Sequence, residues 1–232
     1  MRLLISVIIP AYNEEKYIHR ALSSIKSQSF KDYEVIVVAD SCTDRTAEIA
    51  KGYGCRVIKV KTRNLGKNQN IGASKAKANI LVFLFADTRV TNRYLEEIYH
   101  AVKNGFSRGR PIYFHDSKNP LIMNLHLFEN LLKTQHYPHT YFITKECFNQ
   151  VNGYSEHFNN CMEDIDFAGR INKFNSTYKG CVLKSKAFNS DRRFKKRGWV
   201  KEVVFQTYYL FFYHIIYKIL GIKIAPSYPV VR

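Results

Sequence analysis

Ser6-Val-Ile-Ile-Pro-Ala-Tyr-Asn-Glu14 decides the fold of this chain, because an apolar strand runs straight into polar and acidic residues. The same pattern returns at 35–44 and at 80–87, which end in Asp44 and Asp87. Apolar runs of this kind, separated by helix-like stretches, indicate a parallel sheet buried on both faces. Ligands bind such a sheet at the carboxyl ends of its strands, where these acidic groups are expected. Carboxylates there, close to a basic loop, suit a nucleotide and a metal-bound diphosphate, so the pattern predicts a nucleotide-sugar enzyme.

The composition indicates one large folded domain with a strong positive charge. The 232 residues are enough for a full core, and 46% hydrophobic with 14% aromatic residues exclude global disorder. The chain has 36 Lys and Arg against 19 Asp and Glu, a formal net charge of +17. Such a surplus favours an anionic partner, whether nucleic acid, a phosphorylated substrate or an anionic membrane surface.

The five cysteines are scattered, odd in number and never paired as CxxC. This pattern is typical of reduced thiols in a cytosolic protein, and it argues against a zinc site or a disulfide framework. The sequence enters a core strand almost at once, and Met1-Arg-Leu-Leu-Ile-Ser6 cannot supply the long apolar region of a signal peptide. We therefore expect a cytoplasmic location.

Strand and helix signals alternate through the first hundred residues. Strands are expected at 4–10, 34–39, 55–60 and 80–85, and helices after 13, at 45–51, near 68–78 and from 91 or 92 to 105. This alternation predicts an α/β fold with a Rossmann-like, doubly wound, mostly parallel sheet. The second half is expected to contain a helix at 120–135, a strand at 139–143, a helix at 145–151, an acid-led helix near 161–170 and a strand at 177–188.

A basic segment followed by an aromatic one closes the chain. Residues 184–201 contain eight Lys or Arg and one Asp, and residues 203–222 are apolar and aromatic. Gln206, His214 and Lys218 would be costly at the centre of a bilayer, so we expect an interfacial helix rather than a span. A helix that packs back on the domain or forms a dimer contact remains the alternative. The chain is thus expected to comprise a domain over 1–200 and a helical extension over 201–232.

Four motifs, in order, make the chain similar to family 2 glycosyltransferases of the GT-A fold over roughly residues 4–200. The end of the first strand resembles the family segment that packs on the nucleotide base, with Pro10, Ala11, Tyr12 and Glu14. Asp40 and the following Ser41-Cys-Thr-Asp44 resemble the base-binding turn. Phe85-Ala-Asp87 stands where the family has its metal motif, and Met162-Glu-Asp164 stands where it has its catalytic acids.

The resemblance implies a role for each of these acids. Asp40 would accept from the N–H groups of a uracil or guanine ring, and Asp87 would hold Mg²⁺ or Mn²⁺ on the diphosphate. Lys67, in a Gly-containing loop that leads into a helix, would contact the phosphates. Asp164 would act as the base in one in-line displacement with inversion at the anomeric carbon. Glu163 would orient it or contact the acceptor.

Two positions depart from the family pattern. Ala39 replaces the first of two adjacent Asp residues in the base-binding turn, and Phe85 replaces the first acid of the metal motif. These departures leave open a weakly metal-dependent enzyme, or a catalytically degenerate subunit that keeps nucleotide or glycan binding. Structural roles also stay open, since Asp44 suits a helix cap, and Glu163 and Asp164 suit the first turn of a helix.

The segment 192–199 loosely resembles the Arg- and Trp-bearing segment that closes over donor and acceptor in many relatives. Arg193 and Arg197 are candidates for phosphate contacts, and Trp199 for stacking on a sugar or anchoring at a bilayer surface.

Together these features predict an inverting glycosyltransferase that uses a UDP- or GDP-sugar. Its acceptor is expected to be a hydroxyl or phosphate of a lipid-linked or glycan molecule, and its place the cytoplasmic membrane face, as a peripheral protein on anionic lipid. The positive charge keeps a nucleic-acid-binding protein as a third hypothesis. The sequence has no recognition-helix, RRM or zinc pattern, so nucleic acid is not an expected partner.

Overall fold

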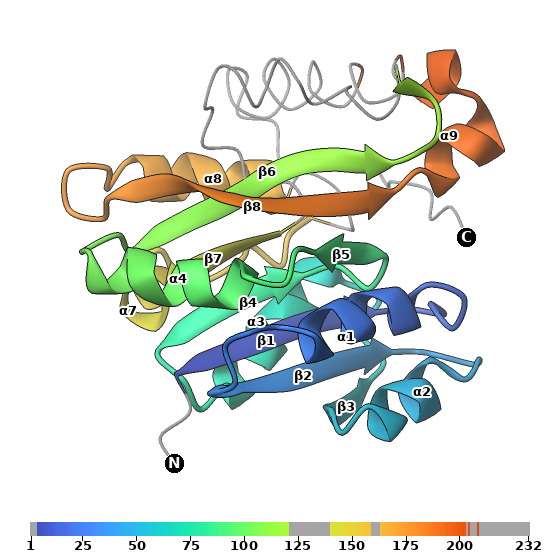
Figure 1. Cartoon of the computed structure of the whole chain (residues 1–232), viewed down its shortest axis with the longest axis horizontal. Coiled ribbons are helices and arrows are strands. Elements are labelled where there is room, and N and C mark those ends of the chain that lie inside the picture. The colour runs from blue at the N-terminus through green and yellow to red at the C-terminus, as the bar shows by residue number, and fades with distance from the viewer. Residues whose placement is uncertain (1–3, 121–139, 159–162, 203, 205–207, 209–232) are drawn as a thin grey trace.

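The computed structural model describes residues 4–120, 140–158, 163–202, 204 and 208, and these include an eight-stranded sheet of order β3-β2-β1-β4-β7-β6-β8-β5 (Figure 1). The strands are β1 (Ile5–Ala11), β2 (Tyr33–Asp40), β3 (Arg56–Val60), β4 (Ile80–Leu84), β5 (Thr88–Val90), β6 (Arg108–Asp116), β7 (Thr140–Thr144) and β8 (Gly180–Ser190). The helices are α1 (Ile18–Lys26), α2 (Thr46–Gly52), α3 (Leu65–Lys75), α4 (Tyr94–Lys103), α7 (Lys145–Gln150), α8 (Glu163–Asn172) and α9 (Arg192–Arg197).

The first four strands form a parallel half-sheet, as the sequence predicts. β1 pairs in parallel with β2 on one side and β4 on the other, and β2 pairs in parallel with β3. The chain therefore moves outward from β1 to β3 and then returns to place β4 on the opposite side of β1. This reversal makes the edge between the carboxyl ends of β1 and β4 the topological switch point, where open α/β sheets bind their ligands.

The second half of the sheet is mixed rather than parallel. β7 runs antiparallel to β4 and to β6, β8 runs parallel to β6, and β5 runs antiparallel to β8. The sequence does not predict β6, because charged residues interrupt its apolar run. Arg108 is fully buried in this strand, where its Nε donates to the Tyr178 carbonyl at 3.1 Å. A buried, hydrogen-bonded arginine is compatible with a strand, but it breaks the pattern by which such strands are predicted.

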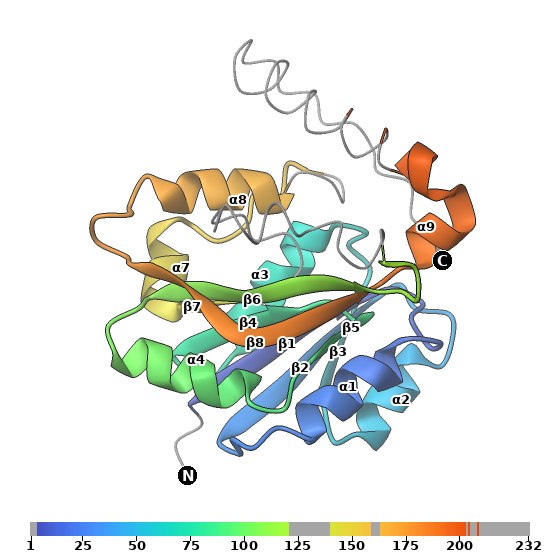
Figure 2. The ribbon, with the colours of Figure 1, turned by 45° about the horizontal axis from the view of Figure 1, so that its top comes forward.

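Helices cover both faces of the sheet, so the molecule has three layers (Figure 2). On β1, Val7 and Ile9 face the core that contains α1, α2 and α4, whereas Ile8 faces the core that contains α3, α7 and α8. The alternation of the strand places successive side chains on opposite faces. At Gly72 of α3, a Cβ atom would lie 2.3 Å from Ile8 Cγ2, so only glycine lets this helix pack so close to the sheet.

α3 begins at Leu65, three residues earlier than the sequence predicts, because Asn64 caps it by accepting from the Lys67 N–H at 2.8 Å. The predicted helices at 120–135 and 203–222 lie outside the described residues, apart from Pro120, Val204 and Tyr208. Within the described part of the chain, no helix is both long and apolar enough to cross a bilayer.

Candidate active site

Three consecutive strands of the parallel half end in sharp turns at one edge of the sheet. Asn13 after β1, Ser41 after β2 and Arg63 after β3 have positive φ angles of 51°, 50° and 55°. Residues other than glycine adopt this conformation at an energetic cost, and it is enriched at ligand sites. The turns are also joined to one another, since the Thr43 N–H donates to Asn13 Oδ1 at 2.8 Å.

Asp40 anchors this edge from within. Its carboxylate is 3% exposed and accepts from the Thr62 N–H at 3.0 Å, from Asn68 Nδ2 at 2.9 Å and from the Ser41 hydroxyl at 2.9 Å. The Thr62 hydroxyl also donates to Asp40 Oδ2 at 3.1 Å. Burial raises the pKa of Asp40, but the hydrogen bonds from Asn68, Ser41 and Thr62 outweigh burial and leave the pKa below its ordinary value. Asp40 is therefore ionised, and its hydrogen bonds fix Thr62 in the loop before α3 and Asn68 in the first turn of α3.

Tyr12 and Arg63 form an aromatic–cation pair above the same turns. The Arg63 guanidinium lies 4.4 Å from the centroid of the Tyr12 ring. Asp44, at the end of the second turn, accepts from the Thr46 N–H at 3.0 Å and from the Glu15 N–H at 3.1 Å, which fits the helix-cap role predicted for it. Pro10 and Ala11 are buried at the end of β1, directly before the first turn, which contains Asn13.

Glu14 and Asp87 flank the switch point, and a single arginine joins them. Arg192 Nη1 lies 2.6 Å from Glu14 Oε2, its Nη2 lies 2.8 Å from Glu14 Oε1, and the same Nη2 lies 3.2 Å from Asp87 Oδ2. The guanidinium also covers the Tyr17 ring at 4.9 Å. The sequence selects Arg193 and Arg197 from this segment and misses Arg192, because nothing in a run of basic residues shows which one points inward.

The predicted catalytic acids begin α8. Glu163 is 6% exposed, and Asp164 Oδ1 accepts from the Ile165 N–H at 2.8 Å. Burial and the charge of Asp164 raise the pKa of Glu163 to about 8, and Arg193 offsets only part of that rise. At neutral pH Glu163 is therefore mostly protonated.

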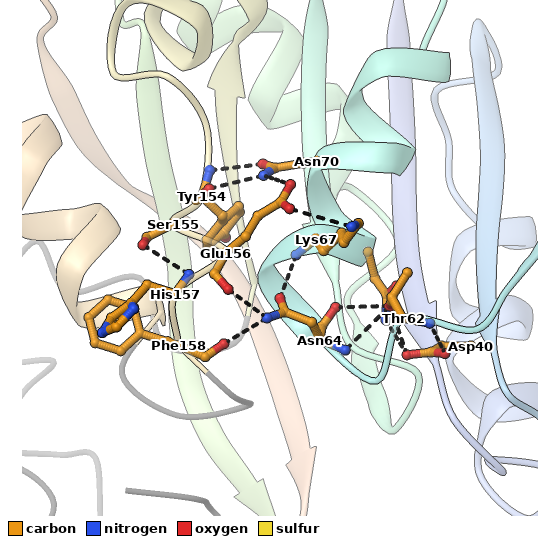
Figure 3. Close-up of polar contacts among 11 residues, drawn as sticks. Asp40, Thr62, Asn64, Lys67, Asn70, Tyr154, Ser155, Glu156, His157 and Phe158 are labelled. Atoms are coloured by element: carbon orange, nitrogen blue, oxygen red, sulfur yellow. Dashed lines mark hydrogen bonds and ion pairs between the residues drawn. The ribbon is translucent and has the colours of Figure 1, made fainter. Parts of the chain in front are cut away.

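A chain of hydrogen bonds connects Asp40, at the end of β2, with residues 154–158, which precede α8 (Figure 3). Thr62, which binds Asp40, is followed by Asn64, whose Nδ2 donates to the carbonyls of Glu156 at 2.9 Å and Phe158 at 3.0 Å. Asn70 on α3 donates to the Tyr154 carbonyl at 2.9 Å and accepts from the Tyr154 N–H at 2.8 Å. The sequence gives no signal for these asparagines, because their role depends on contacts across about 90 positions.

The remaining predicted residues lie at the rim. Lys67 Nζ is 3.8 Å from Glu156 Oε2, and both side chains are about half exposed. Arg197 Nη1 lies 3.2 Å from Glu202 Oε2, and Glu202 is fully buried. Trp199 is 55% exposed. These positions are compatible with contacts to a ligand that approaches from solvent.

The residues at Asp87 do not fit a divalent cation held by the protein alone. Within the described ranges, no three His, Cys, Asp or Glu side chains come together as a cation site. Phe85 removes one acid from the motif, and Arg192 already pairs with the carboxylates of Asp87 and Glu14 and offsets one of their two negative charges. Oxygen-rich sites bind Mg²⁺ or Mn²⁺, and a guanidinium between the oxygens opposes such binding.

The three-layer α/β fold, with acids at the switch point of its sheet, is the arrangement of the GT-A type. The model of Glycosyl transferase family 2 matches residues 6–159. The chain belongs to this family. The match covers most of the domain predicted from the four motifs, and the GT-A fold and family predicted for it are confirmed.

Curated relatives resemble this chain over part of their length. Glycosyltransferase GlyA of Streptococcus pneumoniae is 32% identical over 152 residues, which cover 56% of this chain and 22% of GlyA. The 4,4'-diaponeurosporenoate glycosyltransferase of Staphylococcus haemolyticus is 41% identical over 113 residues, which cover 45% of this chain and 30% of that enzyme. The match thus spans less than a third of each of these two proteins.

Solved structures agree with the fold. TarS residues 1–349 of S. aureus, in complex with UDP-GlcNAc, align with a TM-score of 0.69 at 20% identity. The alignment covers 82% of this chain and 59% of the TarS chain. At this identity the likeness establishes the shared fold.

Proposed function

We propose that this chain is an inverting glycosyltransferase that takes its sugar from a nucleotide-diphosphate donor bound at the switch point. One observation carries the proposal: the Asp40 edge and the segment leading to Asp164 are held together by Asn64. A donor on that edge would bring its anomeric carbon toward the helix that begins with Glu163 and Asp164. The UDP-GlcNAc bound by TarS makes UDP-sugars the first donors to test, with GDP-sugars beside them.

The nucleotide would lie across the turns after β1, β2 and β3. The Tyr12 ring offers a stacking surface for the base, and Arg63 lies against that ring. Asp40 orients Thr62 and Asn68 beneath this surface. A direct contact of Asp40 with a base N–H stays a prediction, and it requires one of these internal hydrogen bonds to be exchanged for one to the base.

Asp164 would act as the base. The acceptor oxygen bonds to the anomeric carbon while the bond from that carbon to the phosphate oxygen breaks, and the acceptor proton passes to Asp164. The nucleoside diphosphate leaves with the bonding electron pair, and the configuration inverts. Glu163 keeps its proton at neutral pH, because burial raises its pKa to about 8, so it suits a hydrogen-bond donor rather than a base.

The divalent cation is the weakest part of the prediction. GT-A glycosyltransferases typically use one, and the resemblance assigns Mg²⁺ or Mn²⁺ to Asp87. Such a cation would offset the charge of the departing diphosphate. Because Arg192 already pairs with Asp87 and Glu14, this assignment is a prediction without support from the donor set of the site.

We also propose a lipid-linked or glycan acceptor reached at an anionic membrane surface, on its cytoplasmic side. α9 carries five cationic side chains within Arg192–Arg197, and large apolar residues stand exposed just after it. These are Trp199, Val200, Val204 and Tyr208. Cationic and aromatic side chains in sequence suit peripheral attachment to anionic lipid.

Asp164→Asn tests the proposed function. The full chain is incubated with UDP- and GDP-sugars and a polyprenyl-phosphate-linked or oligosaccharide acceptor, and the released nucleoside diphosphate is measured. We expect the wild type to turn over, and Asp164→Asn to lose about 100-fold or more in kcat while its donor affinity is kept. Asp166→Asn is the matched control, because this neighbouring acid pairs with Arg170 at 2.8 Å on the same helix.

Two outcomes would contradict the proposal. Equal loss in the two variants would indicate damage to α8 rather than removal of a base. Donor binding without turnover by the wild type, with every acceptor class, would favour the catalytically degenerate subunit that Ala39 and Phe85 leave open.

A further inference from the structure

Arg192 lies at the switch point of the sheet, where a cation would serve a departing diphosphate. It begins α9, directly after β8, and it reaches across the carboxyl ends of β1 and β4 at the topological switch point. Its guanidinium pairs with both acids of that crevice, at 2.6 and 2.8 Å from Glu14 and at 3.2 Å from Asp87. The side chain is 14% exposed, so this is a buried cation in a site already selected by topology.

The guanidinium keeps donor capacity beyond these two ion pairs. Arginine has five N–H donors, and the contacts with Glu14 and Asp87 use Nη1 and Nη2. Among the described residues, the buried Nε has no hydrogen-bond partner. Arginine's planar fork suits phosphate oxygens as well as carboxylates, so the remaining donors fit a diphosphate.

The position of Arg192 is also open to a ligand. It lines a cavity of about 610 Å³ beside the switch point, whose walls include Tyr17 from the segment before α1 and Phe194 of α9, but neither Glu14 nor Asp87. Three further cationic side chains line this cavity together with two acidic ones, and they are Arg20, Lys118 and Lys195 with Asp116 and Asp191. The surplus of positive charge favours an anionic ligand there.

The charge balance explains why a cation is needed in this place. Glu14 and Asp87 are two carboxylates at the ends of neighbouring strands, and on their own they would repel a diphosphate. Burial lowers the pKa of the Arg192 guanidinium, but the hydrogen bonds to Glu14 and the charges of Asp87 and Glu14 outweigh burial and raise it. Arg192 is therefore a permanent positive charge between them.

We propose that Arg192 is the built-in cation of the donor site. In this proposal it binds the diphosphate and stabilises the leaving group in place of a protein-held divalent metal. The inference rests on the proposed transfer from a nucleotide-diphosphate sugar. It assigns a catalytic role to a residue that the sequence does not single out within the segment 192–199. It also gives Phe85 a reason: with a resident guanidinium, the first acid of the metal motif has no ligand role left. Turnover and nucleotide binding then proceed in the presence of a chelator.

The test measures nucleotide binding as well as turnover. UDP or GDP, whichever the wild type binds more tightly, is titrated calorimetrically into the full chain in EDTA and then in MnCl₂. We expect the two wild-type Kd values to agree within about threefold. Arg192→Gln should weaken binding in EDTA by about 100-fold, and Arg192→Lys, which keeps the charge but loses the fork, by about tenfold. Lys196→Gln removes one exposed charge from the same helix, outside this cavity, and should change little.

A second measurement separates this role from a purely structural clamp. Arg192→Gln uncovers the carboxylates of Glu14 and Asp87, so Mn²⁺ alone should raise the Tm of this variant more than that of the wild type. If Arg192→Gln does not fold, Arg192→Lys carries the test through its Kd in EDTA.

The outcomes separate the inference from the function on which it rests. Wild-type binding or turnover that appears only with Mn²⁺ would overturn the role of Arg192 and leave the glycosyltransferase standing. So would unchanged affinity in both Arg192 variants. Failure of the wild type to bind either nucleotide under any condition would overturn both.

Discussion

Glu163 is a carboxyl group that the fold keeps protonated at a cost. Its side chain is buried at the start of α8 beside the charge of Asp164, and burial with that charge raises its pKa to about 8. In the unfolded chain an ordinary Glu titrates near 4.3. Between these two pKa values the folded state holds a proton that the unfolded state releases, so the free energy of unfolding falls as pH rises from about 4.5 to about 8.

Replacing Glu163 by Gln should remove this pH dependence. Near pH 5 we expect Glu163→Gln and the wild type to have similar free energies of unfolding. Near pH 8 the variant should be more stable by about 1 kcal/mol or more, because the amide has no charge to suppress. Urea denaturation at the two pH values measures the difference, with the exposed Glu48→Gln as control. A variant that is equally destabilised at both pH values would contradict this account and indicate a lost contact instead.

At the residue scale, the sequence predicts which acids matter better than it predicts their partners. Asp40 ends β2, Asp87 follows β4 and Asp164 lies in the first turn of α8, and their roles in binding and catalysis stay predictions. Arg192 and Asn64 have no such signal. Their importance comes from contacts with residues far away in the sequence. The sequence does not show which of several arginines or asparagines makes such contacts.

At the scale of elements, Asn64 has two separable tasks. Its Oδ1 caps α3 by accepting from the Lys67 N–H, and its Nδ2 donates to the Glu156 and Phe158 carbonyls that precede the catalytic helix. The first task stabilises one helix, and the second joins the loop after β3 to the 156–158 segment, which precedes the proposed base. A serine can take over the cap but not the carbonyl contacts.

Asn64→Ser and Asn64→Ala should therefore differ in stability but not in turnover. We expect Asn64→Ala to lose about 1 kcal/mol of stability from the cap, and Asn64→Ser to lose less. Both should lower kcat, because neither amide contact remains to hold the 156–158 segment, while Kd for the donor changes less than kcat. Thermal melts and steady-state kinetics of the two variants decide this. If kcat follows Tm across the pair, the asparagine is only a cap.

Elements were predictable where one physical rule governs them. β1, β2 and β4 are buried on both faces and read as apolar runs, and α1 buries Ile18, Ala21, Leu22 and Ile25 at helical spacing. β6 follows another rule, since it has buried arginines whose charge is satisfied by hydrogen bonds. β5 is only three residues long, and its pairing with β8 lies about 100 positions away, beyond any local pattern.

At the scale of the whole molecule, alternation predicted the parallel half-sheet and its switch point but not the mixed half. Right-handed β-α-β crossovers leave few topologies for β1 to β4. After β4 no such rule orders β7, β6, β8 and β5, and the antiparallel pairs come from contacts between distant segments. The second half nevertheless completes the site, because it contributes α8 with its acids and α9 with Arg192.

The surface at α9 leads to a prediction about the molecule as a whole. With a net charge of +17, the chain should adsorb to any anionic surface, so binding alone decides nothing. If α9 is the contact face, the double variant Lys195→Gln/Lys196→Gln should weaken binding to vesicles with 30% phosphatidylglycerol by about 30-fold, since each cation near the surface contributes about 1 kcal/mol. Lys51→Gln/Lys59→Gln removes the same charge from α2 and β3 and should weaken vesicle binding much less.

Trp199→Ser should weaken binding at unchanged charge, because the exposed indole would no longer insert among the lipid headgroups. Sedimentation with vesicles at two salt concentrations measures all three. Equal losses of vesicle binding for the two lysine pairs, with no loss for Trp199→Ser, would contradict this prediction. Binding would then depend only on net charge, and α9 would face another partner.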